Sequence, residues 1–315
     1  MHGRAGWLVA ALALVATATQ IAPRLPGNEN EVSLRTEELG LGSSTTERLR
    51  GTIATGDWLS AEDILFKEAN GSPQSAILLR ALGIAHYQAG HYFSAASALK
   101  RSDALARLEP EARFLLASSF VRIERRHWAR AELERLVARD GDAGSYRLAL
   151  AQVHYDQGQF AAAVWQLDQI LDRKPGWAAA HDLRGQCLEG LGHNGSAIAA
   201  FERAVSLNLK AAVESAWPHY HLGSLSHDLG DLVAAETALA RALAADPAHA
   251  PARRELGIVY MKANKLRLAA EALESAAQLS PLDASVQYSL VSVYRRLGRE
   301  GDAAAAMERF RELSE

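Results

Sequence analysis

Cysteine is almost absent from this chain, because Cys187 is the only one among its 315 residues. A single thiol excludes an intramolecular disulfide framework, a cysteine-rich zinc site and an iron–sulfur cluster held by this chain alone. The sequence around Cys187 is typical of a helix, so we interpret it as a small buried apolar residue rather than a reactive thiol.

The chain also lacks a large excess of charge of either sign, and it has few aromatic residues. The chain has 34 basic and 37 acidic residues, a net charge of −3, and only 7% of its residues are aromatic. This balance argues against a basic nucleic-acid-binding protein, so we expect no nucleic-acid partner. Hydrophobic residues reach 49%, which excludes a disordered chain, and 61 residues are alanine, the strongest helix former. The composition therefore favours an all-helical protein.

Long apolar runs are missing except near the N-terminus. The apolar run 7–15 follows Arg4 and precedes an Ala-Thr-Ala sequence, which is the pattern of a secretory signal peptide. The uncharged stretch 5–22 also approaches the length of a membrane span and is a candidate membrane attachment. We therefore predict that residues 1–22 are a signal peptide or an N-terminal membrane anchor. Either interpretation predicts an exported protein, in the periplasm or outside the cell, or one anchored in the inner membrane and facing outward.

The segment 23–41 combines proline, glycine and charged residues without helical periodicity. This composition predicts a flexible tether. The folded part of the chain is therefore expected to begin at residue 42.

From residue 42 onward the sequence repeats itself. Steps of 34 residues, with one step of 38, lead from alanine to alanine: Ala61, Ala95, Ala129, Ala163, Ala197, Ala235, Ala269 and Ala303. A large apolar residue follows each alanine by four positions, and a mostly small residue precedes it by twelve. Five positions before each alanine stands a row dominated by glycine: Gly56, Gly90, Glu124, Gly158, Gly192, Gly230, Asn264 and Gly298.

Each repeat unit predicts two antiparallel helices. Glycine in the turn supplies the left-handed conformation that ends the first helix, and a proline stops the second helix in four units. Small residues such as Gly257 and Ala269 allow the two helices to approach closely. One hairpin cannot bury its own apolar face, so stacked units are expected to form a solenoid with a continuous core. The predicted repeats span 42–75, 76–109, 110–143, 144–177, 178–215, 216–249, 250–283 and 284–315.

Two units show the pattern especially clearly, with Leu82, Gly83, Gly90, Ala95 and Leu99 in one and Leu256, Gly257, Tyr260, Ala269, Ala276 and Pro281 in the other. This pattern resembles the tetratricopeptide repeat (TPR) family, in an exported, bacterial-type form. The resemblance covers residues 42–315. It implies an all-α fold, an α-solenoid of about eight tandem helix-turn-helix repeats in a right-handed superhelix, and a role as a scaffold for protein–protein interaction.

Two places depart from the repeat pattern. In the first unit, Arg48 and Glu68 stand where the family prefers apolar or small residues, which predicts a capping repeat. Four extra residues fall within 208–215 and predict a longer loop or an extra helical turn, with Pro218 in the first turn of the next helix. The alternative is a bend that opens a partner site beside Trp217.

Motifs of catalysis and cofactor binding give no support to an enzyme. Residues 190–195 match a dinucleotide-binding fingerprint, but they fall between two predicted helices instead of after a strand. His219, His221 and His227 lie on one predicted helix without an acidic or cysteine partner at ligand spacing, so we interpret them as surface histidines. We therefore predict a non-catalytic protein with no cofactor and no metal site. An enzyme-associated regulatory subunit is the least favoured alternative.

The resemblance also implies where a partner binds. In the family, the first helix of each repeat lines a concave groove, and the corresponding residues here are Arg80, Tyr87, Phe114, Tyr155, Tyr220, Arg254, Tyr288 and Arg295, with Ile84, Asp182 and Met261 in the same register. Arginine and aromatic side chains suit a peptide or helix that carries acidic and apolar groups. The alternative is that several of the aromatic residues pack between adjacent repeats.

One class of partner is disfavoured. Family members that clamp the C-terminal carboxylate of chaperones use an asparagine array, and this chain instead has Ile84, Ser118, Gln152, Gln186, Ser224 and Ile258 at those positions. We expect a scaffold or adaptor of the cell envelope that binds a protein or peptide partner. The alternative is a membrane-anchored assembly subunit of an envelope complex.

Overall fold

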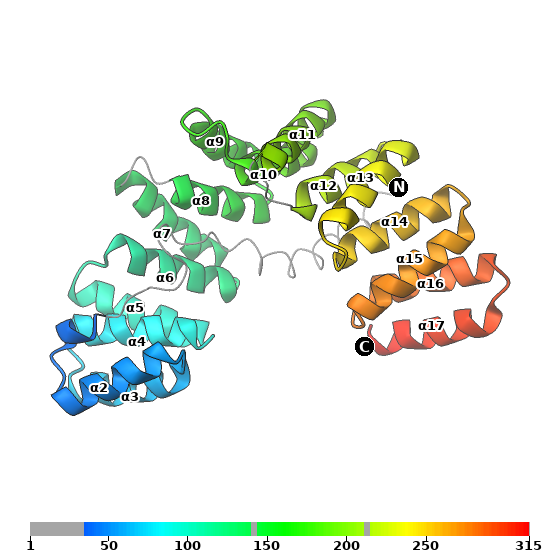
Figure 1. The fold of residues 1–315 in the computed structure, drawn as a ribbon. Coiled ribbons are helices and arrows are strands. Elements are labelled where there is room, and N and C mark those ends of the chain that lie inside the picture. Colours follow the sequence, from blue (N-terminus) through cyan, green and yellow to red (C-terminus); the bar gives the residue numbers. More distant parts are fainter. Residues whose placement is uncertain (1–34, 140–143, 211–214, 315) are drawn as a thin grey trace. The chain divides into compact units, whose positions relative to one another are not determined.

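Helical hairpins make up nearly all of the structure, a computed structural model that describes residues 35–139, 144–210 and 215–314 (Figure 1). The described residues fall into two units, an N-terminal unit that ends at Gln166 and a C-terminal unit that begins at Leu167. Residues 1–34 lie outside the described residues, so the signal peptide or anchor and most of the tether stay predictions.

The N-terminal unit contains four hairpins, each with a first helix (the A helix) and a second helix (the B helix). The A helices are α2 (Ser43–Ala54), α4 (Ala76–Gln88), α6 (Pro110–Arg122) and α8 (Gly144–Asp156). The B helices are α3 (Trp58–Gly71), α5 (Tyr92–Leu105), α7 (Arg126–Arg139) and α9 (Phe160–Leu171), and the last residues of α9 belong to the C-terminal unit.

The C-terminal unit repeats this arrangement. Its A helices are α10 (Ala178–Gly190), α12 (Ala216–Asp228), α14 (Ala250–Lys262) and α16 (Ala284–Arg296). Its B helices are α11 (Asn194–Lys210), α13 (Leu232–Ala245), α15 (Leu266–Leu279) and α17 (Glu300–Glu312). Every predicted repeat therefore contains one hairpin.

The turn between the A and B helices has the same backbone conformation in all eight hairpins. Six of the turn positions are glycines with positive φ, such as Gly90 at +84°. The other two, Glu124 and Asn264, are also left-handed, each with φ of 59°. A left-handed residue after an A helix lets the next backbone N–H groups bond the last carbonyls of that helix, which ends it and reverses the chain. The glycine row of the sequence thus marks the turns.

Close contact between the helices of a hairpin depends on small residues in the A helix. A Cβ atom at Gly83, Gly223 or Gly257 would lie 2.6–2.7 Å from Cγ of a leucine on the B helix of the same hairpin. At Gly185 it would lie 2.5 Å from the Phe201 ring. The alanine row that begins at Ala61 lies on the facing B helices and is buried throughout. These small residues bring the two helix axes together over an apolar core.

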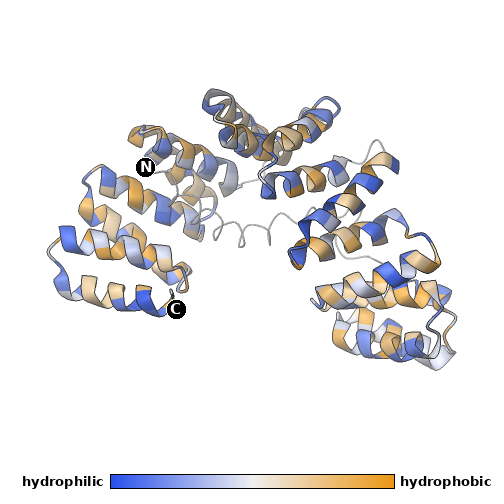
Figure 2. Ribbon diagram, turned by 180° about the vertical axis from the view of Figure 1, so that it is seen from behind, coloured by the Kyte–Doolittle hydropathy of each residue, from blue (hydrophilic) through white to orange (hydrophobic). Residues whose placement is uncertain are grey.

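Successive hairpins pack mainly through the B helix of one and the A helix of the next, such as α13 with α14, and their A helices also contact one another. In the C-terminal unit α10 contacts α12, α12 contacts α14 and α14 contacts α16, whereas α11, α13 and α15 make no comparable contacts with one another. In the N-terminal unit α4 contacts α6. We call the solvent side of the A helices the A-helix face. Figure 2 shows polar and apolar residues mixed along each helix, as expected for helices that bury one side.

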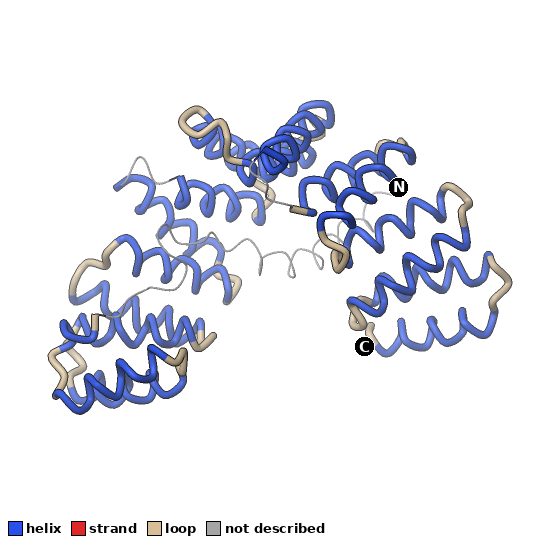
Figure 3. Tube along the Cα trace, in the orientation of Figure 1, coloured by secondary structure: helices blue, strands red, loops and turns tan. Residues whose placement is uncertain are grey.

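The all-helical fold class is confirmed. The described residues contain sixteen α-helices and one short 3₁₀-helix and no strand (Figure 3). Within the same residues, none of the helices combines the length and the apolar character needed to cross a membrane.

The structure corrects the end of the predicted tether. Thr36–Leu39 form a 3₁₀-helix, and Leu39 is only 8% exposed because it packs in the core of the first two hairpins with Leu49. Arg50 of α2 also donates a 2.7 Å hydrogen bond to Glu37. No hairpin precedes α2 among the described residues, and this short segment covers core residues there that would otherwise meet water.

The extra residues between the fifth and sixth repeats lengthen a helix. α11 has 17 residues and runs to Lys210, whereas the other B helices have 12 to 14. Residues 211–214 lie outside the described residues. α12 then begins at Ala216, so Pro218 falls in its first turn as predicted, where the absence of its N–H costs no hydrogen bond.

Candidate functional site

The A-helix face of the N-terminal unit carries a partly exposed cation beside half-buried tyrosines. Arg80 on α4 is half-buried and has no hydrogen-bond or ion-pair partner among the described residues. Tyr87, two turns further along α4, packs edge-on against Tyr92 at 5.4 Å between ring centroids. Burial raises the pKa of the Tyr87 phenol, which Arg122 partly offsets. Both predicted residues of α4 therefore lie where a partner can reach them.

Phe114 does not fit its predicted role. Its side chain is only 4% exposed and packs against Tyr146 at 5.4 Å, in the core between α6 and α8. Tyr155, on α8, is half-buried and packs at a tilt against Phe160, with 5.6 Å between ring centroids. Adjacent hairpins approach closely enough at α6 to enclose a large side chain, so Phe114 stabilises the stack and is not available as a binding anchor.

Arg254 is also committed to the fold. Its guanidinium donates to Ser285 Oγ at 2.9 Å and to Asp283 at 3.4 Å, which joins α14 to the N-terminus of α16. Tyr220 lies beside it. Burial, then the nearby Glu255 carboxylate, raises the pKa of Tyr220 to about 12. The sequence places this pair on the correct helices, but the structure uses Arg254 internally instead of presenting it to a partner.

Tyr288 and Arg295 are the two predicted residues that the structure leaves most open. They lie two turns apart on α16; Tyr288 is 60% exposed and Arg295 is exposed. The Tyr288 ring rests on Phe310 of α17 at 5.5 Å, which fixes its position. Arg295 has no hydrogen-bond or ion-pair partner among residues 215–314. Together they present a fixed aromatic ring and an unpaired guanidinium, a combination suited to binding a peptide.

Two of the three histidines of α12 have acidic partners, which corrects their interpretation as surface histidines, while His219 is half-buried. His221 Nδ1 lies 2.9 Å from Asp182 of α10, and His227 Nδ1 lies 2.6 Å from Glu255 of α14. His227 itself is buried. The acidic partners come from the preceding and following hairpins, so inspection of α12 alone misses them. His221 and His227 contact different carboxylates, and among the described residues none of these histidines belongs to a group of three converging metal ligands.

An aromatic cluster covers the start of α12. Trp217 packs against His249 at 4.5 Å and Tyr220 at 5.8 Å. His249 Nδ1 accepts the Ala252 N–H at 3.1 Å, which caps α14. Burial lowers the pKa of His249, so its ring is neutral at pH 7 with the proton on Nε2. These rings lie against one side of Trp217, and the alternative of a bend within 208–215 stays a prediction because residues 211–214 lie outside the described residues.

Glu189, at the end of α10, has an unusual electrostatic setting. Burial raises its pKa from 4.5 to about 7; the nearby His221 opposes this rise and Asp228 adds to it. The sequence carries no direct signal for this behaviour, because His221 and Asp228 belong to the next repeat. The A-helix face of the C-terminal unit thus holds a carboxyl group that changes charge near neutral pH.

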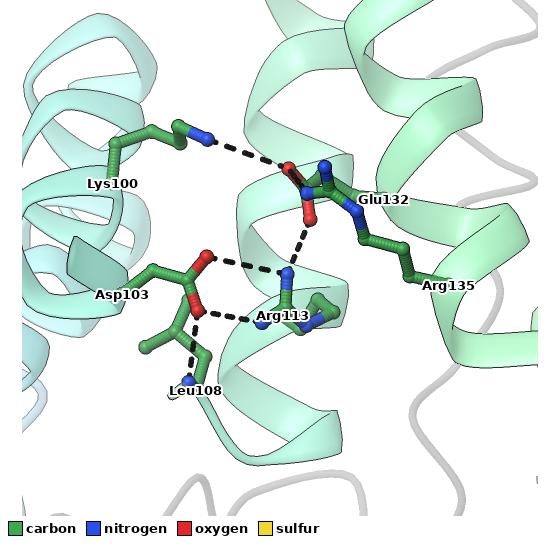
Figure 4. Close-up of polar contacts among 6 residues, drawn as sticks. All are labelled: Lys100, Asp103, Leu108, Arg113, Glu132 and Arg135. Atoms are coloured by element: carbon green, nitrogen blue, oxygen red, sulfur yellow. Dashed lines mark hydrogen bonds and ion pairs between the residues drawn. The ribbon is translucent and has the colours of Figure 1, made fainter. Parts of the chain in front are cut away.

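A second polar network lies inside the N-terminal unit (Figure 4). Arg113 of α6 is only 7% exposed and donates to Asp103 at 2.6 Å and to Glu132 at 2.5 Å. Arg135 and Lys100 approach Glu132 from the solvent side at 2.8 and 3.6 Å. Each buried charge here has a partner of opposite sign. Because Asp103, Arg113 and Glu132 come from α5, α6 and α7, the network joins these three helices.

Three family models match the chain. A tetratricopeptide repeat-like domain matches residues 78–226, and two tetratricopeptide repeat models match residues 218–249 and 254–315. No curated protein matches the chain.

Several solved structures have a similar fold. A tetratricopeptide repeat protein from Parabacteroides merdae ATCC 43184 has a TM-score of 0.66 at 14% identity, over 82% of this chain and 98% of that one. A chain of the APC/C hetero-tetramer Cut9–Hcn1 has a TM-score of 0.61 at 15% identity, over 90% and 55%. PilW, a type IV pilus biogenesis factor, has a TM-score of 0.58 at 22% identity, over 64% and 92%. At these identities the similarity shows a common fold.

Proposed function

The chain belongs to the tetratricopeptide repeat family, and on that basis we propose that it is a non-catalytic scaffold that binds a protein or peptide partner through its A-helix face. Binding is a use that suits a stack of hairpins, because rigid A helices hold side chains at fixed positions along an extended surface. The proposal requires residues that the fold itself does not consume.

One observation carries this proposal: Tyr288 and Arg295 are exposed on one helix and make no internal polar pair. Lys262, exposed on the neighbouring α14, adds a second cation to that end of the face. Arginine recognises carboxylates with two parallel hydrogen bonds, and a tyrosine ring offers apolar area at a small entropy cost. The preferred partner is therefore an acidic segment with aromatic or aliphatic residues.

A peptide selection tests this proposal. The full chain is used to select from a library of random-sequence peptides, and the affinity of a selected peptide is measured by calorimetry. We expect the selected peptides to combine Asp or Glu with apolar residues. The double substitution Tyr288→Ala and Arg295→Ala should weaken binding by about tenfold or more, because anchors of these two types dominate most interfaces.

The matched control is Arg267→Ala, which removes an exposed cation from the B helix α15 of the same unit. It should leave the affinity unchanged. Loss of binding with Arg267→Ala and full binding by the A-helix double variant would place the partner on the B helices and contradict the proposal.

We further propose that the scaffold works in the cell envelope. The support is the N-terminal sequence, with a basic residue, an apolar run and small residues in the order of a signal peptide. Mass spectrometry of the protein from its native cells would give the mature N-terminus. A start near residue 23 supports a cleaved signal, an intact N-terminus in the membrane fraction supports the anchored assembly subunit, and an intact protein in the cytosol contradicts both.

A further inference from the structure

Three potential metal ligands meet where the first hairpin packs on the second. Glu62 comes from α3, His86 lies near the end of α4, and His91 immediately precedes α5. His86 Nδ1 is 3.2 Å from one carboxylate oxygen of Glu62, and His91 Nδ1 is 2.8 Å from the other. All three ligand atoms lie within 4.8 Å of one another, and no other group of three in the described residues does so.

The backbone fixes the separation of the two histidines. The His91 N–H donates to the His86 carbonyl at 2.8 Å, and the Gly90 N–H donates to the Tyr87 carbonyl at 3.1 Å. These two bonds, with Gly90 at a φ of +84°, form a Schellman motif that ends α4. Two imidazoles are thereby held beside the carboxylate by main-chain geometry, without a flexible loop.

His86 has an unsatisfied polar atom in this cluster. The side chain is 8% exposed, and its buried Nδ1 makes no hydrogen bond with the described residues, although it lies close to Glu62. A buried nitrogen that approaches a carboxylate without a well-aligned hydrogen bond is incompletely satisfied, and such atoms call for a physical explanation. A neutral imidazole offers such a nitrogen as a metal ligand.

The other repeats show what these three positions do when no metal can bind. In the third and fourth hairpins they are Arg130, His154 and Gln159, and His154 Nδ1 bonds Gln159 at 2.7 Å. In the sixth and seventh they are Glu236, Tyr260 and Lys265, where Lys265 bonds Glu236 at 2.6 Å and lies over the Tyr260 ring. In both of these places the side chains interact with one another without a metal. Among the three places compared, only the contact between the first and second hairpins has three side chains that can bind a metal.

We propose that Glu62, His86 and His91 bind a divalent transition-metal ion of the Zn²⁺ class. Two imidazole nitrogens and one carboxylate oxygen are ligands that Zn²⁺ accepts, with bonds of about 2.0–2.2 Å. A tetrahedral ion with such bonds separates its ligand atoms by about 3.3 Å, close to the 3.2 Å between His86 Nδ1 and one Glu62 oxygen. The 2.8 Å between His91 Nδ1 and the other Glu62 oxygen is a hydrogen-bond distance that would widen when the metal binds. Three protein ligands leave a fourth position open, and the exposed His91 marks the side on which solvent can reach it.

Zinc binding would connect the first hairpin to the second, because Glu62 belongs to one and both histidines to the other. Sequence analysis predicts no metal site here, since Glu62 lies 29 residues before His91 and only the repeat register brings them together. A ligand that binds the folded state alone stabilises it by a free energy that grows with the logarithm of its concentration over its dissociation constant. The metal should therefore protect the start of the array in particular.

The test is calorimetric titration of the full, tag-free, chelator-treated chain with ZnCl₂, together with thermal unfolding with and without Zn²⁺. We expect one equivalent to bind and to raise the unfolding temperature. His91→Gln copies the residue that stands at this position in the fourth hairpin, and Glu62→Gln keeps the shape of the side chain. Each should weaken Zn²⁺ binding by about tenfold or more and abolish the thermal shift.

His193→Gln is the matched control. His193 is exposed at the same position of the fifth hairpin, where Leu188 and Val164 replace the other two ligands. This variant should bind Zn²⁺ as the parent does. Absence of saturable binding by the parent, or equal binding by the parent and both ligand variants, would overturn the proposal and leave an ordinary hydrogen-bonded carboxylate.

Discussion

Arg113 carries a permanent charge into the core of the N-terminal unit, whereas in the C-terminal unit His221 and His227 connect three successive A helices. The first network joins α5, α6 and α7 through Asp103 and Glu132. The second joins α12 to α10 and α14 through one imidazole–carboxylate contact each. A guanidinium has several donors and can bond two carboxylates at once, whereas each of these imidazole rings contacts one carboxylate through Nδ1.

The surrounding groups extend this difference. In the N-terminal unit, burial alone would raise the pKa of Asp103, but the Leu108 N–H and Arg113 outweigh it, and the pKa is lowered. In the C-terminal unit, burial raises the pKa of Glu189 to about 7 and lowers that of His249. Asp103 should therefore lose its charge only in strong acid, whereas Glu189 of the C-terminal unit should change its charge between pH 4.5 and 7.

The largest expected effect comes from removing the permanent charge. Arg113→Ala leaves Glu132 and Asp103 without their buried partner and should cost about 3–5 kcal/mol of unfolding free energy. Hydrogen exchange should accelerate in α5–α7 while α12–α14 keep their protection. Arg135→Ala removes a largely exposed partner of the same Glu132 and should cost less than about 1 kcal/mol. Equal losses in the two variants would show that the buried contact has no special weight.

The next effect concerns the close approach of A and B helices. Alanine at Gly223 of α12 would place its Cβ 2.7 Å from Leu239 Cγ and 3.2 Å from the Leu239 backbone nitrogen. Gly223→Ala should therefore destabilise by about 1–3 kcal/mol in spite of its better helix propensity. Gly51→Ala in α2 has nothing within 4 Å of the new Cβ and should stabilise by up to about 1 kcal/mol. Denaturant unfolding measures the change in the free energy of unfolding for both variants. An increase for Gly223→Ala would contradict the tight packing.

These small residues are also where the sequence was most informative. The 34-residue period identified the turn at Glu124 and Asn264 as well as at the six glycines, because the position in the repeat determines the backbone conformation. The same period gave the buried alanines and the helix pairs. Features that every repeat shares can be predicted from one sequence, since eight copies reinforce the signal.

Features that differ between repeats were harder to predict. Phe114 and Tyr288 occupy the same repeat position, yet one is enclosed between hairpins and the other is open at the last hairpin. His227 contacts Glu255, 28 residues away, and the sequence around neither residue predicts this contact. Burial and pairing at these positions depend on which side chains the neighbouring repeats supply, so they required the structure.

A third prediction tests the pH response of the C-terminal unit. The Glu189 carboxyl has a folded pKa of about 7, above its ordinary value of 4.5. The folded state thus binds the proton more tightly, and stability from this group is present below pH 4.5 and lost as the pH rises to 7. Glu189→Gln should match the parent at pH 4.5 and exceed it by roughly 1–2 kcal/mol at pH 8, after allowance for partial exposure.

Urea unfolding at both pH values measures this difference, and hydrogen exchange should locate it in α10–α12. Glu202→Gln, on the exposed side of α11, is the control and should show no such pH dependence. A Glu189→Gln variant whose advantage is independent of pH would show that ionisation of this carboxyl is not the cause.

The smallest effect compares the one turn in each unit that lacks glycine. Glu124 and Asn264 both have φ of 59°, where a side chain other than glycine is strained. Glu124→Gly should relieve that strain and stabilise the N-terminal unit by about 0.5–1 kcal/mol. Asn264→Gly should gain almost nothing, because asparagine tolerates this conformation and its side chain accepts a 2.8 Å hydrogen bond from Arg296, which glycine removes. Thermal unfolding of the two variants provides the comparison, and an equal gain in both would mean that the asparagine contact contributes nothing to its turn.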